Sequence, residues 1–176
     1  IISQILLQTY KGNLKYSQNQ DCFFIYQYRS NGLWSGISDT EMKGEVKHRL
    51  DLVKETLLPS GYSMNLVNDI VEQLRISVIF DEWYEGNDHL LFTNGILDIN
   101  TKELLPFDKG MHFTQQLPYD YKPELECEPI IKWLKRTQDG NWDRVQVLRA
   151  WLRAVLLSHS DIQKFVEIVG PGKSGK

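Results

Sequence analysis

The feature that most constrains the fold is the junction between an apolar run and a glycine-rich loop at residues 165–176. Phe165–Val169 is mostly β-branched or aromatic, which is typical of a buried strand. The run continues into Gly170-Pro171-Gly172-Lys173-Ser174-Gly175-Lys176, which matches G-x-x-x-x-G-K as far as the lysine. Glycines let backbone N–H groups surround a phosphate, and the lysine of such a loop reaches the β- and γ-phosphates. The sequence therefore predicts a nucleotide-phosphate-binding loop over these seven residues.

A flexible Gly/Lys tail is the alternative interpretation, because only three positions of the motif are fixed. A strand immediately before the loop is the context that the motif requires, and it favours the phosphate site. The Ser/Thr of the motif and the helix after it do not follow, since the sequence stops at Lys176. We therefore expect a chain cut at the start of a P-loop ATPase core, with no complete catalytic site and no ATP hydrolysis of its own.

Charge is unevenly distributed along the chain, whose net charge is −3. Residues 1–127 contain 11 Lys/Arg and 18 Asp/Glu, whereas residues 128–164 contain 7 Lys/Arg and 4 Asp/Glu. An acidic front argues against nucleic-acid binding through overall charge. Any DNA contact is expected to be local and to lie in the basic stretch.

Bulk properties are those of a globular chain outside the membrane. Hydrophobic residues make up 41% of it, and no apolar run reaches the roughly 20 residues that span a bilayer. Cys22 and Cys127 lie far apart and are expected to be free thiols in a reducing compartment. The expected location is the cytoplasm of a bacterial host or of a virus-infected cell.

Helices and a hairpin are predicted for the first eighty residues. A helix ends at Lys11-Gly12, and strands at 22–28 and 33–37 are joined by a turn at 30–32. Ser38 and Glu41 form a capping box for a helix that stops before Pro59, and a second helix is predicted over 64–79. The first of these helices is expected to bury one apolar stripe, formed by Met42, Val46, Leu50, Val53 and Leu57. Two helices beside a hairpin are also compatible with a winged DNA-reading unit, although packing alone explains their residues.

Trp34 is a candidate DNA contact within this hairpin. Together with Tyr26 and Tyr28 it offers aromatic rings on which the bases of a single strand can stack. Cross-strand aromatic packing is the alternative, and it is the more frequent use of such residues. Both interpretations remain open at the level of sequence.

Strands and turns are predicted from residue 88 onward, followed by two helices. Asn94-Gly95 is a hairpin turn between 90–92 and 96–99, and further extended runs are predicted at 103–106 and 113–117. Helices are predicted over 128–138 and 142–158, with a break at 139–141. The side chains expected to be buried are Ile130, Ile131 and Leu134 in the first helix and Val145, Leu148, Leu152, Val155 and Leu156 in the second. Arg149 and Arg153 share the outer face of the second helix. They are either a solvated surface or a contact with DNA phosphates or a neighbouring subunit.

Metal sites and catalytic constellations are not indicated by the remaining polar residues. The four histidines show no pairing at helical spacing, and the acidic cluster at 81–88 has no regular ligand spacing. Asn94 and Asp98 are more simply a turn residue and an exposed strand carboxylate than ligands. No metal ligand is therefore predicted.

The order of motifs from Asn94 onward resembles a known family. The motifs on which this resemblance rests are Asn94–Asp98, Thr101–Leu104 with Pro106, Phe113-Thr114, Leu117–Tyr121, Cys127, Leu134, Leu148 and Gln163–Phe165 before the loop. This resembles the domain preceding the superfamily 3 helicase core, of AAA+ type, in poxvirus-type and phage/plasmid primase–helicases. The likeness covers 88–176, while 1–87 resembles the family only loosely. Lys173 departs from the small residues usual in that loop.

The resemblance implies an α+β fold with small antiparallel hairpins and helices, a helical collar-like segment and one strand of an ATPase core. The expected domains are a mixed α/β helicase-associated domain at 1–122, the collar-like segment at 123–164 and the truncated P-loop core at 165–176. The implied parent is an ATP-dependent DNA helicase of replication, a hydrolase that binds ATP and Mg²⁺, engages single-stranded or forked DNA and forms a hexameric ring. The chain would be its accessory domain and would bind neither cofactor alone. The alternative is a stand-alone protein-interaction or weak single-strand-binding module without nucleotide chemistry.

Overall fold

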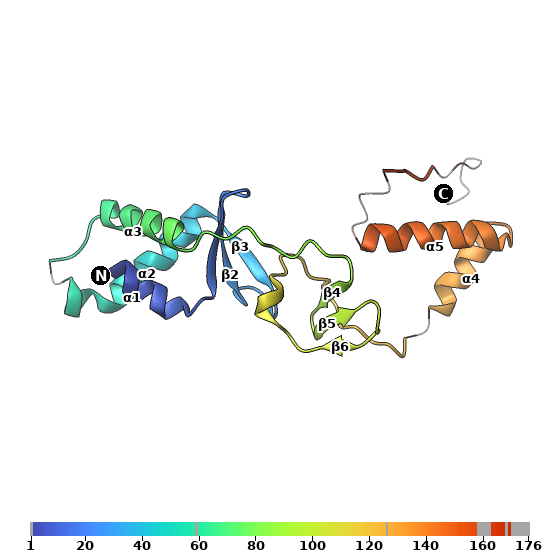
Figure 1. Ribbon diagram of the computed structural model, residues 1–176, viewed down its shortest axis with the longest axis horizontal. Coiled ribbons are helices and arrows are strands. Elements are labelled where there is room, and N and C mark those ends of the chain that lie inside the picture. Colours follow the sequence, from blue (N-terminus) through green and yellow to red (C-terminus); the bar gives the residue numbers. More distant parts are fainter. Residues whose placement is uncertain (1, 59, 126, 158–162, 168, 170–176) are drawn as a thin grey trace.

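The computed structural model describes residues 2–58, 60–125, 127–157, 163–167 and 169. In this part the chain is α+β, with two three-stranded antiparallel sheets and five α-helices, which confirms the coarse fold class. Figure 1 shows helices at both ends of the molecule and the sheets between them. The elements are α1 (Ile2–Tyr10), β1 (Leu14–Ser17), β2 (Cys22–Tyr26), β3 (Trp34–Ile37), α2 (Asp39–Leu57), α3 (Met64–Ser77), β4 (His89–Phe92), β5 (Gly95–Asp98), β6 (Leu104–Leu105), a 3₁₀ helix η1 (Lys109–Met111), α4 (Glu128–Thr137) and α5 (Trp142–Leu156).

The first sheet has the order β1-β2-β3, and its hairpin β2–β3 is the predicted one. Strand β1 was not predicted. Its alternation places Leu14 and Tyr16 in the core and Lys15 on the other face, but four residues after a glycine turn give a weak signal.

Helices α1–α3 cover one face of this sheet and form the larger core. The apolar stripe predicted for α2 is buried at Met42, Val46 and Leu50 and half-buried at Val53. The predicted capping box is confirmed, because the Ser38 hydroxyl accepts the Glu41 N–H at 3.2 Å and the Glu41 carboxylate accepts the Ser38 N–H at 2.7 Å. Side chains that form the core are Leu6, Tyr10, Leu14, Tyr16, Phe23, Ile25, Ile37, Met42, Val46, Leu50, Val67, Ile70, Val71 and Leu74.

The second sheet has the order β4-β5-β6 and contains the predicted Asn94-Gly95 turn. Gly95 has a φ of +156°, and a Cβ there would lie 2.6 Å from the carbonyl oxygen of Leu105, so only glycine fits. The Asn94 side chain donates to the carbonyl of Tyr121 and accepts its N–H, at 3.0 and 2.9 Å. Asn94 is therefore a turn and tethering residue.

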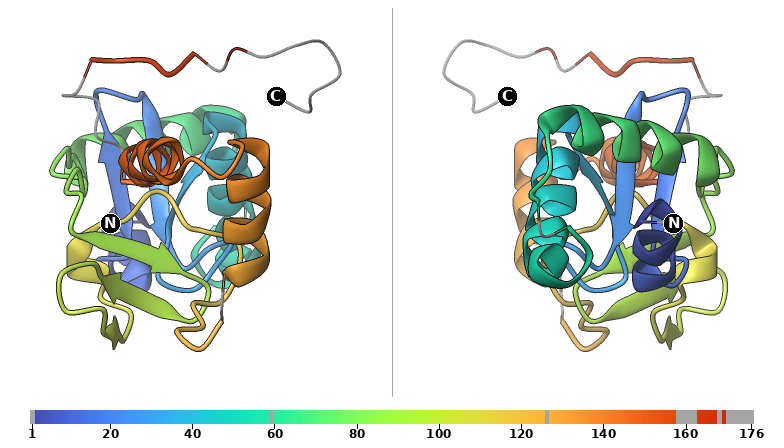
Figure 2. Two further views of the ribbon diagram at one scale, coloured as in Figure 1. Left: turned by 90° about the vertical axis from the view of Figure 1, so that its right-hand side faces the viewer. Right: turned by 90° about the vertical axis from the view of Figure 1, so that its left-hand side faces the viewer.

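The burial predicted for the apolar side chains of α4 and α5 is wrong for several of them. Leu134 and Val145 are buried where the two helices pack, but Leu152, Val155 and Leu156 are exposed although a buried stripe was predicted. Ile130 is exposed as well. Ten residues of α4 can cover only one stripe of α5, and among the described residues no sheet packs along the rest of it. Figure 2, left, shows this pair, here called the hairpin α4–α5, nearest the viewer.

The strand expected at 165–169 is not observed in its described positions. Residues 163–167 and 169 belong to no helix or strand, and the Phe165 side chain is 84% exposed. A strand needs a hydrogen-bonded neighbour, and the described part of the chain provides none for this segment. The predicted phosphate-binding loop, Gly170–Lys176, lies outside the described residues.

Within the described ranges, none of the helices combines the length and the apolar character that crossing a bilayer would require.

Candidate nucleic-acid interface

Helix α5 carries Arg149 and Arg153 on one face and three apolar side chains on the opposite face, which Arg144 shares. With about 3.6 residues per turn, Trp142, Arg149 and Arg153 fall on one face, since seven and eleven residues are close to two and three turns. Val147, Trp151 and Val155 are spaced by four and fall on the opposite side. The helix therefore presents two separate surfaces.

The turn between α4 and α5 brings a lysine of one helix onto a tryptophan of the next. Asp139 and Gly140 both have positive φ, 52° and 76°, and reverse the chain. The Asn141 side chain then caps α5 by accepting the Arg144 N–H at 3.1 Å. As a result the Lys135 Nζ lies 4.7 Å from the centre of the Trp142 ring.

Trp142 remains accessible although it has two cationic neighbours. Its side chain is 41% exposed. Besides Lys135, the guanidinium carbon of Arg149 lies 6.0 Å from the ring centre. We call these three residues the Trp142 cluster.

Most cations of the hairpin α4–α5 have no carboxylate partner. Lys132 pairs with Glu128 at 3.1 Å, which is the one ion pair found there among the described residues. Those without an ion pair in the same part of the structure are Lys135, Arg136, Arg144, Arg149 and Arg153. Unpaired Lys and Arg side chains at a surface are suited to phosphate oxygens. Of the predicted contacts, Arg149 and Arg153 are thus exposed and available.

Trp34, the third predicted contact, lies at a different place and is buried. Only 1% of it is exposed, its indole Nε1–H donates to the carbonyl of Lys109 at 3.1 Å, and its ring centre lies 5.4 Å from that of Tyr26. No ring face is left for a base, so the geometry fits the alternative of cross-strand packing.

A cluster of rings surrounds Lys15 on the same face of the first sheet. The Lys15 Nζ lies 5.3 Å from the Trp34 ring centre and also contacts the ring of Phe80. Burial lowers the pKa of Lys15 to about 8. The pKa of His112 is also lowered, first by burial of its ring and then by the positive charge of Lys15 nearby. Phe80 and His112 come from segments without regular structure, which is why sequence reasoning missed this cluster.

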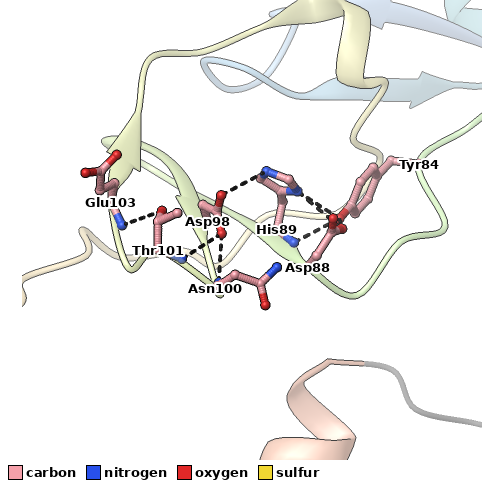
Figure 3. Close-up of polar contacts among 7 residues, drawn as sticks. All are labelled: Tyr84, Asp88, His89, Asp98, Asn100, Thr101 and Glu103. Carbon is pink, nitrogen blue, oxygen red and sulfur yellow. Dashed lines mark hydrogen bonds and ion pairs between the residues drawn. The ribbon is translucent and has the colours of Figure 1, made fainter.

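A polar network joins the second sheet to the segment before it (Figure 3). The His89 N–H donates to the Tyr84 hydroxyl at 2.9 Å, and the Tyr84 hydroxyl donates to Asp88. The His89 ring lies between two carboxylates, with Nδ1 3.2 Å from Asp88 and Nε2 3.9 Å from Asp98. Burial and the bond to Asp88 raise the pKa of Tyr84 to about 12, while the bonds from Tyr84 and His89 lower the pKa of Asp88.

A cavity of about 370 Å³ lies beside this network and reaches the end of α5. Tyr84 and His89 line it together with Leu91, Phe113 and Leu156. The carboxylates of the network already accept hydrogen bonds, and among the described residues no group of three His, Cys, Asp or Glu side chains could hold a metal ion. We interpret the network as a tether for the hairpin β4–β5.

The fold defines an α+β domain made of a helix-covered sheet, a second small sheet and an extended helical hairpin. Residues 3–139 match the family model described as D5 N terminal like. The match covers well over half of the chain, which therefore belongs to this family, the N-terminal domain of D5-type primase–helicases. The predicted family is thus confirmed, and the match includes residues 3–87, where the sequence showed only a loose likeness. It ends at Asp139, so α5 lies beyond it.

Proposed function

We propose that this chain is the accessory domain of an ATP-dependent replication primase–helicase and that it supports ring assembly and DNA engagement. Family membership supports the primase–helicase context. ATP and Mg²⁺ would be bound by the whole parent, with Gly170–Lys176 as the phosphate contacts.

The observation that carries the assembly role is the exposed apolar surface of the hairpin α4–α5. Val147 and Val155 are 59% and 60% exposed on one side of α5, and Leu152 lies beside them. On α4, Ile130 and Trp133 are exposed as well. Apolar side chains gathered on two short helices are typical of a surface that another protein covers.

A second copy of the same chain is the proposed occupant, because the charges are complementary. Residues 128–164 carry 7 basic and 4 acidic side chains, whereas residues 1–127 carry 11 basic and 18 acidic side chains. The basic hairpin of one copy can therefore lie against the acidic front of the next. Such a head-to-tail contact uses two different surfaces and closes into a ring when the rotation permits.

Zero-length carbodiimide cross-linking of mixed ¹⁵N-labelled and unlabelled chain tests this contact. The reagent joins lysines to carboxylates in direct contact, and isotopically mixed peptides identify links between copies. We expect mixed links from Lys132, which lies outside the face of Arg149 and Arg153, to carboxylates of residues 1–127. These links should be lost in Val147→Glu/Val155→Glu and retained in Leu52→Glu, a matched change on the exposed side of α2. Links that are only intramolecular would contradict the proposed contact.

A further inference from the structure

We infer that the Trp142 cluster is a binding site for single-stranded nucleic acid, in which a base stacks on the indole and Lys135 and Arg149 hold the flanking phosphates. The inference specifies the DNA engagement of the proposed function and rests on that function for its biological role. Its aromatic ring lies on the face of α5 opposite Val147 and Val155, so substitutions at these two valines leave the ring in place.

The indole provides the stacking surface. Trp142 lies at the first turn of α5, where the side chain is at the edge of the hairpin and 41% exposed. Stacking of a base on an aromatic ring contributes about 1–3 kcal/mol and accepts every base, because each base has a π-face. This is the chemistry expected for contact with an unpaired strand.

The two cations provide the phosphate contacts. Lys135 comes from α4 and Arg149 from α5, and both approach the Trp142 ring. The Lys135 Nζ lies 4.7 Å and the Arg149 guanidinium carbon 6.0 Å from the ring centre. Neither has a carboxylate partner in the described part of the chain, so a phosphate would not have to displace one. Both side chains are exposed, and their transfer from the ring to a phosphate requires little desolvation.

A further cation extends the site along the helix. Arg153 lies one turn after Arg149 on the same face and is also exposed and unpaired within the described ranges. A row of cations beside an aromatic ring follows a strand for more than one nucleotide. The site therefore fits an extended single strand better than a mononucleotide.

Fluorescence anisotropy of a labelled oligothymidine, titrated with the chain at several salt concentrations, tests the site. We expect Trp142→Ala to weaken binding about tenfold, the range of one lost base stack, and Trp142→Phe to restore most of it. Lys135→Gln and Arg149→Gln should each weaken binding and reduce its salt dependence. Lys132→Gln is the matched control, because this lysine of the same helix is already paired with Glu128, and it should bind like the unsubstituted chain.

Several outcomes would overturn the inference. One is an affinity for oligothymidine that Trp142→Ala leaves unchanged. A second is an equal loss of affinity in Lys132→Gln and Lys135→Gln. A third is tighter binding of a duplex than of oligothymidine. Far-UV circular dichroism of each variant separates a lost contact from a lost helix, and Trp142→Phe provides a folded variant with a ring. A parallel titration with labelled oligouridine compares the affinity for RNA with the affinity for DNA.

The assembly proposal can fail without affecting this test. Val147→Glu/Val155→Glu should keep the affinity of the unsubstituted chain for oligothymidine even when it no longer forms links between copies. Loss of binding in that variant would show that the strand binds an assembled surface and would contradict the site inferred here.

Discussion

Leu50 and Leu52 are two residues apart in α2 and lie on opposite sides of it, with 0% and 73% of their side chains exposed. Leu50 packs into the core between α2, α3 and the first sheet, whereas Leu52 faces solvent. Because the residue types are identical, the pair separates the effect of burial from that of composition.

Truncation of these two leucines should therefore have very different effects. Leu50→Ala should lower the free energy of unfolding by roughly 2–5 kcal/mol, because it removes buried methyl groups and leaves a cavity. Leu52→Ala should change it by less than about 0.5 kcal/mol. Urea denaturation followed by circular dichroism measures both. Similar losses in the two variants would show that α2 does not pack as described.

Two glycines of the same helical unit should respond to alanine with opposite signs. Gly44 is exposed within α2, so Gly44→Ala should raise the free energy of unfolding by about 0.5–1 kcal/mol. Gly61 has a φ of +82°, and Gly61→Ala should lower it by about 1 kcal/mol. Nothing lies within 4 Å of a Cβ at either position, so backbone conformation alone decides the sign. Urea midpoints of the two variants should move in opposite directions, and movement in the same direction would refute this.

Asp98 should make the second sheet sensitive to acid. Backbone N–H donors of Thr101 and Asn100 hold the pKa of Asp98 below its ordinary value of 3.8. A depressed pKa in the folded state stabilises the fold above 3.8, and this contribution is lost as the pH falls through the folded pKa. Asp98→Asn should therefore flatten the acid limb of the stability curve. Unfolding midpoints below pH 5 measure it, with a ¹³C titration of the Asp98 carboxyl as a direct check; identical acid limbs would contradict the expectation.

Lys15 should titrate far below an ordinary lysine. Burial beside Trp34 and Phe80 lowers the pKa of Lys15 from 10.5 to about 8. Between these two values the unfolded chain binds more protons than the folded chain, so the Lys15 contribution makes stability rise with pH over that window. An NMR titration of the Lys15 side chain should have its midpoint near 8, and Phe80→Ala should move it toward 10.5. A midpoint near 10.5 in the unsubstituted chain would show that the ring cluster is open.

Local patterns predicted the elements that depend on local chemistry. The Ser38–Glu41 capping box, the buried stripe of α2 and the Asn94-Gly95 turn each involve residues within a few positions of one another, and all three are confirmed. The family was also recognised from the order of short motifs, and the match to residues 3–139 supports it.

Features that depend on distant partners were not predictable in this way. The apolar spacing of α5 predicts a buried face, but whether a face is covered depends on which element packs on it, and little does. Trp34 is an aromatic residue of a hairpin in either interpretation, and only the positions of Lys109 and His112 show that it is enclosed. The contact between Lys135 and Trp142 depends on the angle between two helices, although a tryptophan seven residues before an arginine was a visible signal.

Sedimentation equilibrium of the chain over a concentration series measures whether copies assemble through the hairpin α4–α5. We expect an average mass that rises above the 20.6 kDa of one copy as concentration increases. In Val147→Glu/Val155→Glu the mass should return to 20.6 kDa, whereas Leu52→Glu should behave like the unsubstituted chain. A mass of 20.6 kDa at every concentration, or an assembly that the double substitution leaves intact, would contradict this expectation.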